Sequence, residues 1–175
     1  MGHLFARLHL LFDYQVIDGM IYVVGGTNGT QILNTVQCFN PILKKWYERS
    51  SMTENRCYVS TATIDGIIYA MGGHNGRHRL KTCEKYDPIR DLWIPFEDMN
   101  VVRSDASSAV YNKQIYIAGG LNDQIIENTV EVYNPLDRTW TFIQPMSTPR
   151  TSLGFIYFDK HLYAIGGNNG LERFA

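Results

Sequence analysis

The chain has 175 residues, of which 45% are hydrophobic and 13% aromatic, so it has ample material for the core of one domain. Its 16 Lys and Arg residues against 17 Asp and Glu residues leave a formal net charge of −1, which excludes a global basic field for nucleic acid or anionic lipid. Its three cysteines are an odd number, which favours a reducing, cytoplasmic location over a disulfide framework.

The first predicted element is an atypical segment over residues 1–17. Its opening run carries Arg7 and lacks the long apolar core of a signal peptide or membrane span, so no membrane association is predicted. The stretch LLFDYQVI follows, with Leu11, Phe12 and Tyr14 where later units have smaller or polar residues. We expect this stretch to form the inner strand of a first structural unit.

Four short runs separated by turn residues make up the unit that begins at residue 57. They are CYVSTATI (57–64), IIYAMGG (67–73), TCEKYDP (82–88) and LWIPF (92–96). Each run is too short for a typical helix and suits a strand. Asp65-Gly66 joins the first two runs and is a favoured two-residue hairpin turn. The unit is therefore predicted to contain four antiparallel strands.

This unit recurs every 47 residues. The recurring positions are the pairs Gly25-Gly26, Gly72-Gly73, Gly119-Gly120 and Gly166-Gly167, the tryptophans Trp46, Trp93 and Trp140, and the arginines Arg56, Arg103 and Arg150. A fixed period of this size indicates one supersecondary unit used repeatedly. The glycine pairs are therefore interpreted as structural, and they match neither phosphate-binding pattern, G-x-G-x-x-G or G-x-x-x-x-G-K-[ST].

Four-stranded units at a constant period are typical of the blades of a β-propeller, so the predicted fold class is all-β. The predicted repeats span residues 18–56, 57–103 and 104–150, with a partial fourth over 151–175. About three and a half units cannot close a ring for which at least four blades are expected. We therefore expect an incomplete propeller and a chain that is a fragment of a longer protein.

The phrases IYVVGGTNG, VEVYNP and MSTPR resemble those of kelch repeats, and the resemblance covers roughly residues 18–170. The Arg after each Met and the Asn-Gly loops are most similar to the kelch-like proteins, in which BTB and BACK domains precede the propeller. The resemblance implies a substrate-recognition part of a cullin-3 ubiquitin ligase adaptor, with cullin-3 bound through BTB and BACK domains outside this chain. Some kelch proteins bind actin filaments instead, so an actin-binding cytoskeletal protein is the alternative.

The three recurring arginines are the first candidate binding residues. Because Arg56, Arg103 and Arg150 occupy equivalent points between blades, we expect them on one face, around the mouth of the central channel. The resemblance implies that arginines at this position contact acidic partner peptides, with the guanidinium bidentate to carboxylates. The alternative is that each Arg bonds carbonyls of the neighbouring blade. The predicted partner is a protein substrate with an acidic segment.

The loops after the glycine pairs are the second candidate. They should open on the same face, and they differ: TNGTQ, HNGRH, LNDQI and NNGLE. Variable loops on a repeated scaffold commonly carry specificity. The predicted partner contacts in these loops are Thr27, His74, Asn75, Arg77, Leu121, Asn122 and Asn168.

No catalytic, cofactor or metal site is predicted. The inward-facing strands offer Ser60, Asp105, Ser107 and Ser108. No His or paired carboxylates recur near them, so an acid–base set is not indicated. The spacing of His74 and His78 suits a metal only on a helix, and these residues are expected in a loop. The sequence thus predicts a binding module and not an enzyme.

Overall fold

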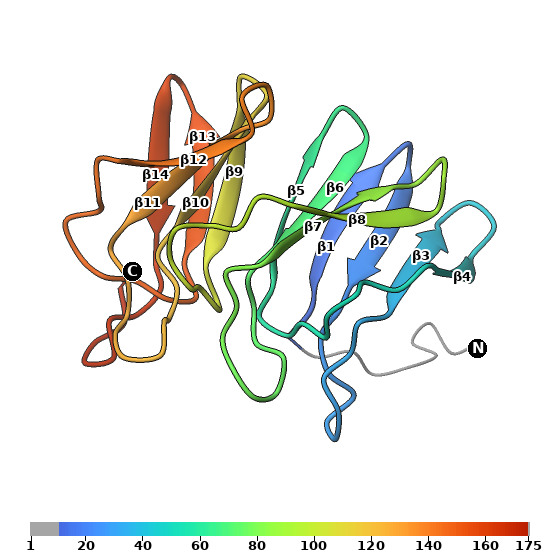
Figure 1. Cartoon of the computed structure of the whole chain (residues 1–175), viewed down its shortest axis with the longest axis horizontal. Coiled ribbons are helices and arrows are strands. Elements are labelled where there is room, and N and C mark those ends of the chain that lie inside the picture. Colours follow the sequence, from blue (N-terminus) through green and yellow to red (C-terminus); the bar gives the residue numbers. More distant parts are fainter. Residues whose placement is uncertain (1–10, 175) are drawn as a thin grey trace.

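The computed structural model describes residues 11–174, which form four antiparallel sheets in succession along the chain (Figure 1). The first sheet contains β1 (Asp13–Ile17), β2 (Met20–Val24), β3 (Val36–Asn40) and β4 (Lys45–Arg49). The second contains β5 (Ser60–Ile64), β6 (Ile67–Met71), β7 (Cys83–Asp87) and β8 (Leu92–Phe96). The third contains β9 (Ser107–Tyr111), β10 (Gln114–Ala118), β11 (Val130–Asn134) and β12 (Thr139–Ile143). The last contains β13 (Gly154–Phe158) and β14 (His161–Ile165).

The sheets are arranged as propeller blades, which confirms the predicted fold class. In each four-stranded sheet the strands pair in chain order, and the first strands of successive sheets lie next to one another in the order β1, β5, β9, β13. The stretch expected to form a first inner strand supplies β1, which pairs with β2 along its whole length. Residues 11–174 contain no helix, and therefore none that could cross a membrane.

Tight hairpins connect the first two strands of every sheet. Asp65 and Gly66 have φ angles of 49° and 78°, and Asn112 and Lys113 have 50° and 57°. Two consecutive positive φ angles are the requirement of a type I′ turn, whose twist matches that of the flanking strands. The predicted turn at Asp65-Gly66 is confirmed, and its backbone geometry also forms where glycine is absent.

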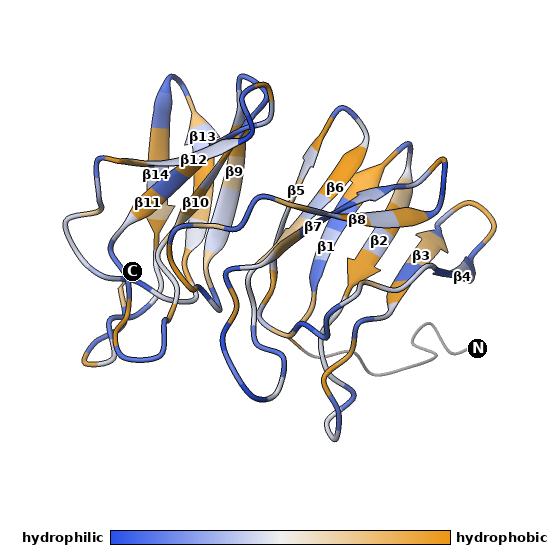
Figure 2. Cartoon of the chain, viewed as in Figure 1, coloured by the Kyte–Doolittle hydropathy of each residue, from blue (hydrophilic) through white to orange (hydrophobic). Residues whose placement is uncertain are grey.

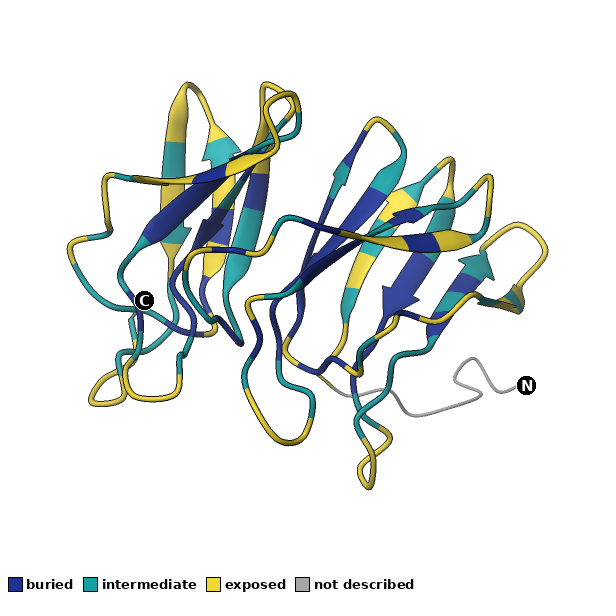
Figure 3. Cartoon of the chain, viewed as in Figure 1, coloured by how far each residue is buried: buried dark blue, intermediate teal, exposed yellow. Residues whose placement is uncertain are grey.

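The hydrophobic core lies between the sheets. Tyr69, Met71 and Phe96 of the second sheet pack in one cluster with residues of β10, β11 and β12. Apolar residues therefore concentrate on the strands (Figure 2), while the exposed residues gather in the loops and on the outermost surfaces (Figure 3). The indole Nε1 of Trp93 donates to the carbonyl of Ser50 at 2.9 Å, so this repeated tryptophan links neighbouring blades. The three cysteines are free and buried.

The outward face of β13 and β14 exposes four large apolar side chains, Ile156, Phe158, Tyr163 and Ile165. The equivalent residues of the second sheet, Ala62, Ile64, Tyr69 and Met71, are covered by the third sheet. A blade buries its faces mainly against its neighbours, and an open edge is a template for association.

We therefore expect the 175-residue chain to self-associate in solution, and Phe158→Lys together with Ile165→Lys to reduce that association. Sedimentation velocity over a range of concentrations measures it. Ile89→Lys is the control, because Ile89 is 97% exposed in an outer turn. A monodisperse monomer for the unaltered chain would contradict the expectation.

Candidate functional site

The glycine pairs bring two connections of the chain into close contact. Gly72 has a φ of 63°, and a Cβ built on it would lie 2.3 Å from the carbonyl oxygen of Arg103. The amide of Gly73 donates to that same carbonyl at 2.8 Å. The segment between one sheet and the next therefore passes directly over the glycine pair, where no side chain fits. The glycines are therefore structural, as interpreted from the sequence, and this contact is their role.

The side chain of Arg56 is fully buried and reaches into the second sheet. Its Nη1 donates to the carbonyls of Gly72 and Thr82, both at 2.8 Å. Its Nε and Nη2 donate to Oε1 of Glu84 at 3.2 and 3.0 Å. The other oxygen of Glu84 accepts from the amide of Thr53 at 2.7 Å. The arginine and the glutamate together tie the connection between two blades to the second blade.

Arg103 repeats this arrangement one blade further on. Its Nη1 donates to the carbonyls of Gly119 and Thr129 at 2.7 and 3.1 Å, and its Nη2 lies 3.0 Å from Oε1 of Glu131. Neither side chain of this ion pair is exposed to solvent. Burial lowers the pKa of the Arg103 guanidinium, and the charge of Glu131 opposes that shift.

The burial of Arg56 and Arg103 contradicts the prediction that they contact a partner. Their donors are directed to carbonyls and a carboxylate of the next blade, so the alternative interpretation of the repeated arginine is the one that holds for both. Arg150 differs because it is partly exposed. It donates to the carbonyl of Gly166 at 2.7 Å, and its guanidinium lies 4.2 Å from the ring centre of Phe174.

The four loops after the glycine pairs share one backbone design and project from one edge of the array, the lower edge in Figure 1. In each, an asparagine Oδ1 accepts from the backbone amides two and three residues later. These asparagines are Asn28, Asn75, Asn122 and Asn169. The residue before each asparagine closes the loop by a β-bridge: Thr27, His74, Leu121 and Asn168. Asn75 and Asn122, which were predicted to contact a partner, therefore use their side-chain oxygens to shape their loops.

The exposed side chains of these loops are at their tips. They include the pairs Thr30 and Gln31, Arg77 and His78, Gln124 and Ile125, and Leu171 and Glu172, and Asn28, Asp123 and Arg173 are exposed as well. Of the predicted contacts, only Arg77 belongs to this set. Sequence reasoning missed the other tip residues. A signal for them exists, because the two positions after Gly29, Gly76, Asp123 and Gly170 differ in chemistry in every repeat.

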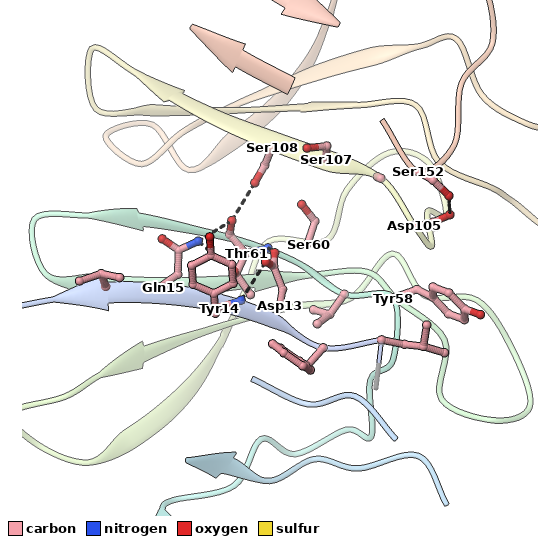
Figure 4. A pocket seen from close by; sticks show the side chains of 15 residues that line it. Asp13, Tyr14, Gln15, Tyr58, Ser60, Thr61, Asp105, Ser107, Ser108 and Ser152 are labelled. Carbon is pink, nitrogen blue, oxygen red and sulfur yellow. Dashed lines mark hydrogen bonds between the residues drawn. The ribbon is translucent and has the colours of Figure 1, made fainter. Parts of the chain in front are cut away.

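A pocket of about 770 Å³ lies on the inner side of the array, along the first strands of the sheets. It is bordered by β1, β5, β9 and the segments that lead into them, and we call it the mouth pocket (Figure 4). The structure brings together here the inward-facing residues Ser60, Asp105, Ser107 and Ser108. Hydroxyl and amide groups link neighbouring blades: Ser108 Oγ donates to the carbonyl of Thr61 at 2.9 Å, as does Gln15 Nε2 at 3.0 Å.

A row of non-glycine residues with positive φ runs along the rim of the mouth pocket. Leu11, Tyr58, Asp105 and Ser152 are spaced by 47 residues and have φ angles of 57°, 52°, 59° and 54°. The amides of Tyr58, Asp105 and Ser152 each donate to the carbonyl of the preceding residue in this row, at 2.9, 2.9 and 3.1 Å. We call these four residues the mouth belt. Positive φ is uncommon for such residues, so sequence reasoning missed the belt.

Among the described residues, the lining of the mouth pocket contains hydroxyls, two carboxylates and aromatic rings, and no His or Cys. Burial raises the pKa of Asp13, although the amides of Tyr14 and Thr61 donate to its carboxylate. Among the described residues no group of three or more His, Cys, Asp or Glu side chains could hold a metal ion.

Comparison with known proteins identifies the repeat. Residues 14–167 match the family described as the KLHDC2/KLHL20/DRC7 Kelch-repeats domain. The chain is 42% identical over 45 residues to F-box/kelch-repeat protein At1g22040 of Arabidopsis thaliana, across 26% of this chain and 10% of that protein. It is 38% identical over 48 residues to Kelch repeat-containing protein kel-10 of Caenorhabditis elegans, across 27% of this chain and 8% of that protein.

The solved structure entitled "Structure of YjhT" is similar in three dimensions, with a TM-score of 0.82 and 17% sequence identity. The similarity covers 91% of this chain and 59% of that one. At this level of identity the likeness shows the fold alone. The matches to the two sequence relatives span about a tenth of their lengths or less.

Proposed function

The chain belongs to the kelch-repeat proteins, whose repeats form a protein–protein interaction module, and we propose that it recognises substrates for a cullin-3 ubiquitin ligase. Cullin-3 would be bound by BTB and BACK domains elsewhere in the protein. The repeat style supports a place among the kelch-like proteins, and a relationship to kelch-like protein 10 is part of the same proposal. A cytoplasmic location and the absence of catalysis belong to the same proposal.

The observation that carries this proposal is the design of the loop edge. The four loops have the same asparagine-to-amide hydrogen bonds, but each presents a different pair of exposed side chains at its tip. The pair Arg77 and His78 is basic, whereas the pair Leu171 and Glu172 is apolar and acidic. A rigid scaffold with variable tips is suited to bind one protein surface in preference to others. The mouth pocket lies near the bases of these loops, because Cys57 and Ser104, which precede Tyr58 and Asp105 of its lining, form β-bridges with His74 and Leu121.

The buried arginines do not support the acidic partner segment that the sequence predicts. Its predicted contacts were the three arginines, and the guanidinium groups of Arg56 and Arg103 are neutralised by Glu84 and Glu131 inside the protein. The exposed basic side chains on the loop edge include Arg77 and His78 of one loop and Arg173 of another.

Affinity purification of the full-length protein from cells that express it tests the proposal. We expect cullin-3 and a substrate to co-purify, and the substrate to accumulate when cullin activation is inhibited. Replacing Gln124 and Ile125 at one loop tip with Ser should reduce the substrate and leave cullin-3 unchanged, because Asn122 still shapes the loop. Co-sedimentation with actin filaments in the absence of cullin-3 would contradict the proposal and favour the cytoskeletal alternative.

A further inference from the structure

The charged groups that line the mouth pocket are acidic. Among the described residues, the ionisable side chains of its lining include two carboxylates, Asp13 and Asp105, and no Lys, Arg or His. Arg103, two residues from Asp105, offers no compensation because its charge is paired with Glu131. We infer that the mouth pocket receives a Lys or Arg side chain of a protein partner, an inference that rests on the proposed binding function and specifies the chemistry of the partner.

The carboxylate of Asp105 is the group best placed to meet that cation. Its Oδ2 accepts from the hydroxyl of Thr151 at 2.8 Å and from the hydroxyl of Ser152. Among the described residues no donor contacts its Oδ1, and no cation pairs with either oxygen. On other surfaces of the protein, Asp65 and Asp123 each face a Lys or Arg at 2.8 and 3.6 Å. Asp105 therefore presents a partly exposed carboxyl group whose Oδ1 accepts from no donor of the described residues.

Tyr58 provides a second attraction for the same group. It precedes Asp105 in the mouth belt, is joined to it by a backbone hydrogen bond of 2.9 Å, and is 41% exposed. Figure 4 shows the two side chains at the same end of the pocket, together with Ser152. A guanidinium or ammonium group over an aromatic ring gains cation–π energy, and a nearby carboxylate adds to it.

The neighbouring surface fits the rest of a long basic side chain. Leu11 and Phe12 border the same pocket and are 44% and 42% exposed. Lys and Arg lay their aliphatic stems on such apolar surface while the charged group contacts polar atoms. An acidic side chain would instead meet Asp13 and Asp105 with like charge, which disfavours the occupant predicted from the sequence.

Peptide selection on the immobilised 175-residue chain tests the inference. Four pools of random twelve-residue peptides differ only in a fixed central residue, which is Arg, Lys, Gln or Glu. We expect the Arg and Lys pools to be retained at least about fivefold more than the Gln pool, and the Glu pool less than the Gln pool. A further unbiased random pool reports whether the chain binds peptides at all.

Two variants assign the preference to the mouth belt, and each introduces a residue that already occupies an equivalent belt position. Asp105→Ser introduces the residue type of Ser152, and Tyr58→Leu introduces that of Leu11. Both of these residues have a positive φ in the structure, so we expect the variants to retain it. We expect Asp105→Ser to abolish the preference for Arg and Lys, and Tyr58→Leu to reduce it about threefold. Asp65→Ser, on a hairpin turn away from the pocket, is the matched control and should leave it unchanged.

Thermal melts check that the variants fold, and Asp105→Asn replaces Asp105→Ser if the latter does not, because Asn tolerates positive φ well. Equal retention of the four pools, or a preference that survives loss of the Asp105 charge, would overturn the inference and leave the binding function standing. Enrichment of the Glu pool would overturn it in favour of an acidic partner. Retention of no pool, the unbiased one included, would overturn both.

Discussion

Replacing Arg103 with Ala is expected to lower the free energy of unfolding by about 3 to 5 kcal/mol, because it leaves a buried carboxylate without its partner. Glu131 is fully buried and would keep only the donors of Asn100 and Val101. The carbonyls of Gly119 and Thr129 would also lose the donor that Arg103 supplies. Urea denaturation monitored by tryptophan fluorescence measures the change.

Two further variants separate the buried ion pair from a general effect of removing an arginine. Arg77→Ala, at an exposed loop tip, should change the free energy of unfolding by less than about 0.5 kcal/mol. Arg103→Met combined with Glu131→Leu should be less destabilising than Arg103→Ala, since neither charge is then left unpaired. If Arg103→Ala unfolded at the same urea concentration as the unaltered protein, the structural role of Arg103 would be refuted.

Gly72→Ala is expected to lower the free energy of unfolding by about 2 to 5 kcal/mol, the combined effect of a strained backbone and overpacking. The φ of Gly72 is 63°, and the added Cβ would lie 2.3 Å from the carbonyl oxygen of Arg103 and 3.2 Å from that of Leu80. Backbone atoms cannot move aside as the end of a flexible side chain does. The connection between two blades would have to shift.

Gly66→Ala is the matched control for this substitution. Gly66 also has a positive φ, 78°, but a Cβ there would meet nothing within 4 Å. Its effect should therefore be limited to the backbone strain, about 1 to 2 kcal/mol. The same urea titration compares the two variants, and equal destabilisation would show that the close approach at Gly72 has no energetic importance.

The blade itself was predictable from the sequence because its signals are local. Asp65-Gly66 specifies a hairpin from two residues, and the run LWIPF coincides with β8, from Leu92 to Phe96. Each of these signals recurs every 47 residues, so several copies in the chain support the same assignment. The loop edge was predictable for the same reason, although only the structure shows that Asn75 and Asn122 shape the loops and that the following tip residues face solvent.

The sequence by itself thus determined the repeat, the all-β blades and the edge on which variable loops gather, since turns and strand periodicity act within one unit. The tertiary structure decided the role of the arginines. The position of an arginine in the repeat is the same whether its guanidinium faces a partner or the next blade. In the structure, ion pairs with Glu84 and Glu131 of the next blade hold the guanidinium groups of Arg56 and Arg103 inside the protein. The conformation of the mouth belt likewise depends on contacts between blades, because Tyr58 and Asp105, which have positive φ angles, donate hydrogen bonds to residues 47 positions earlier.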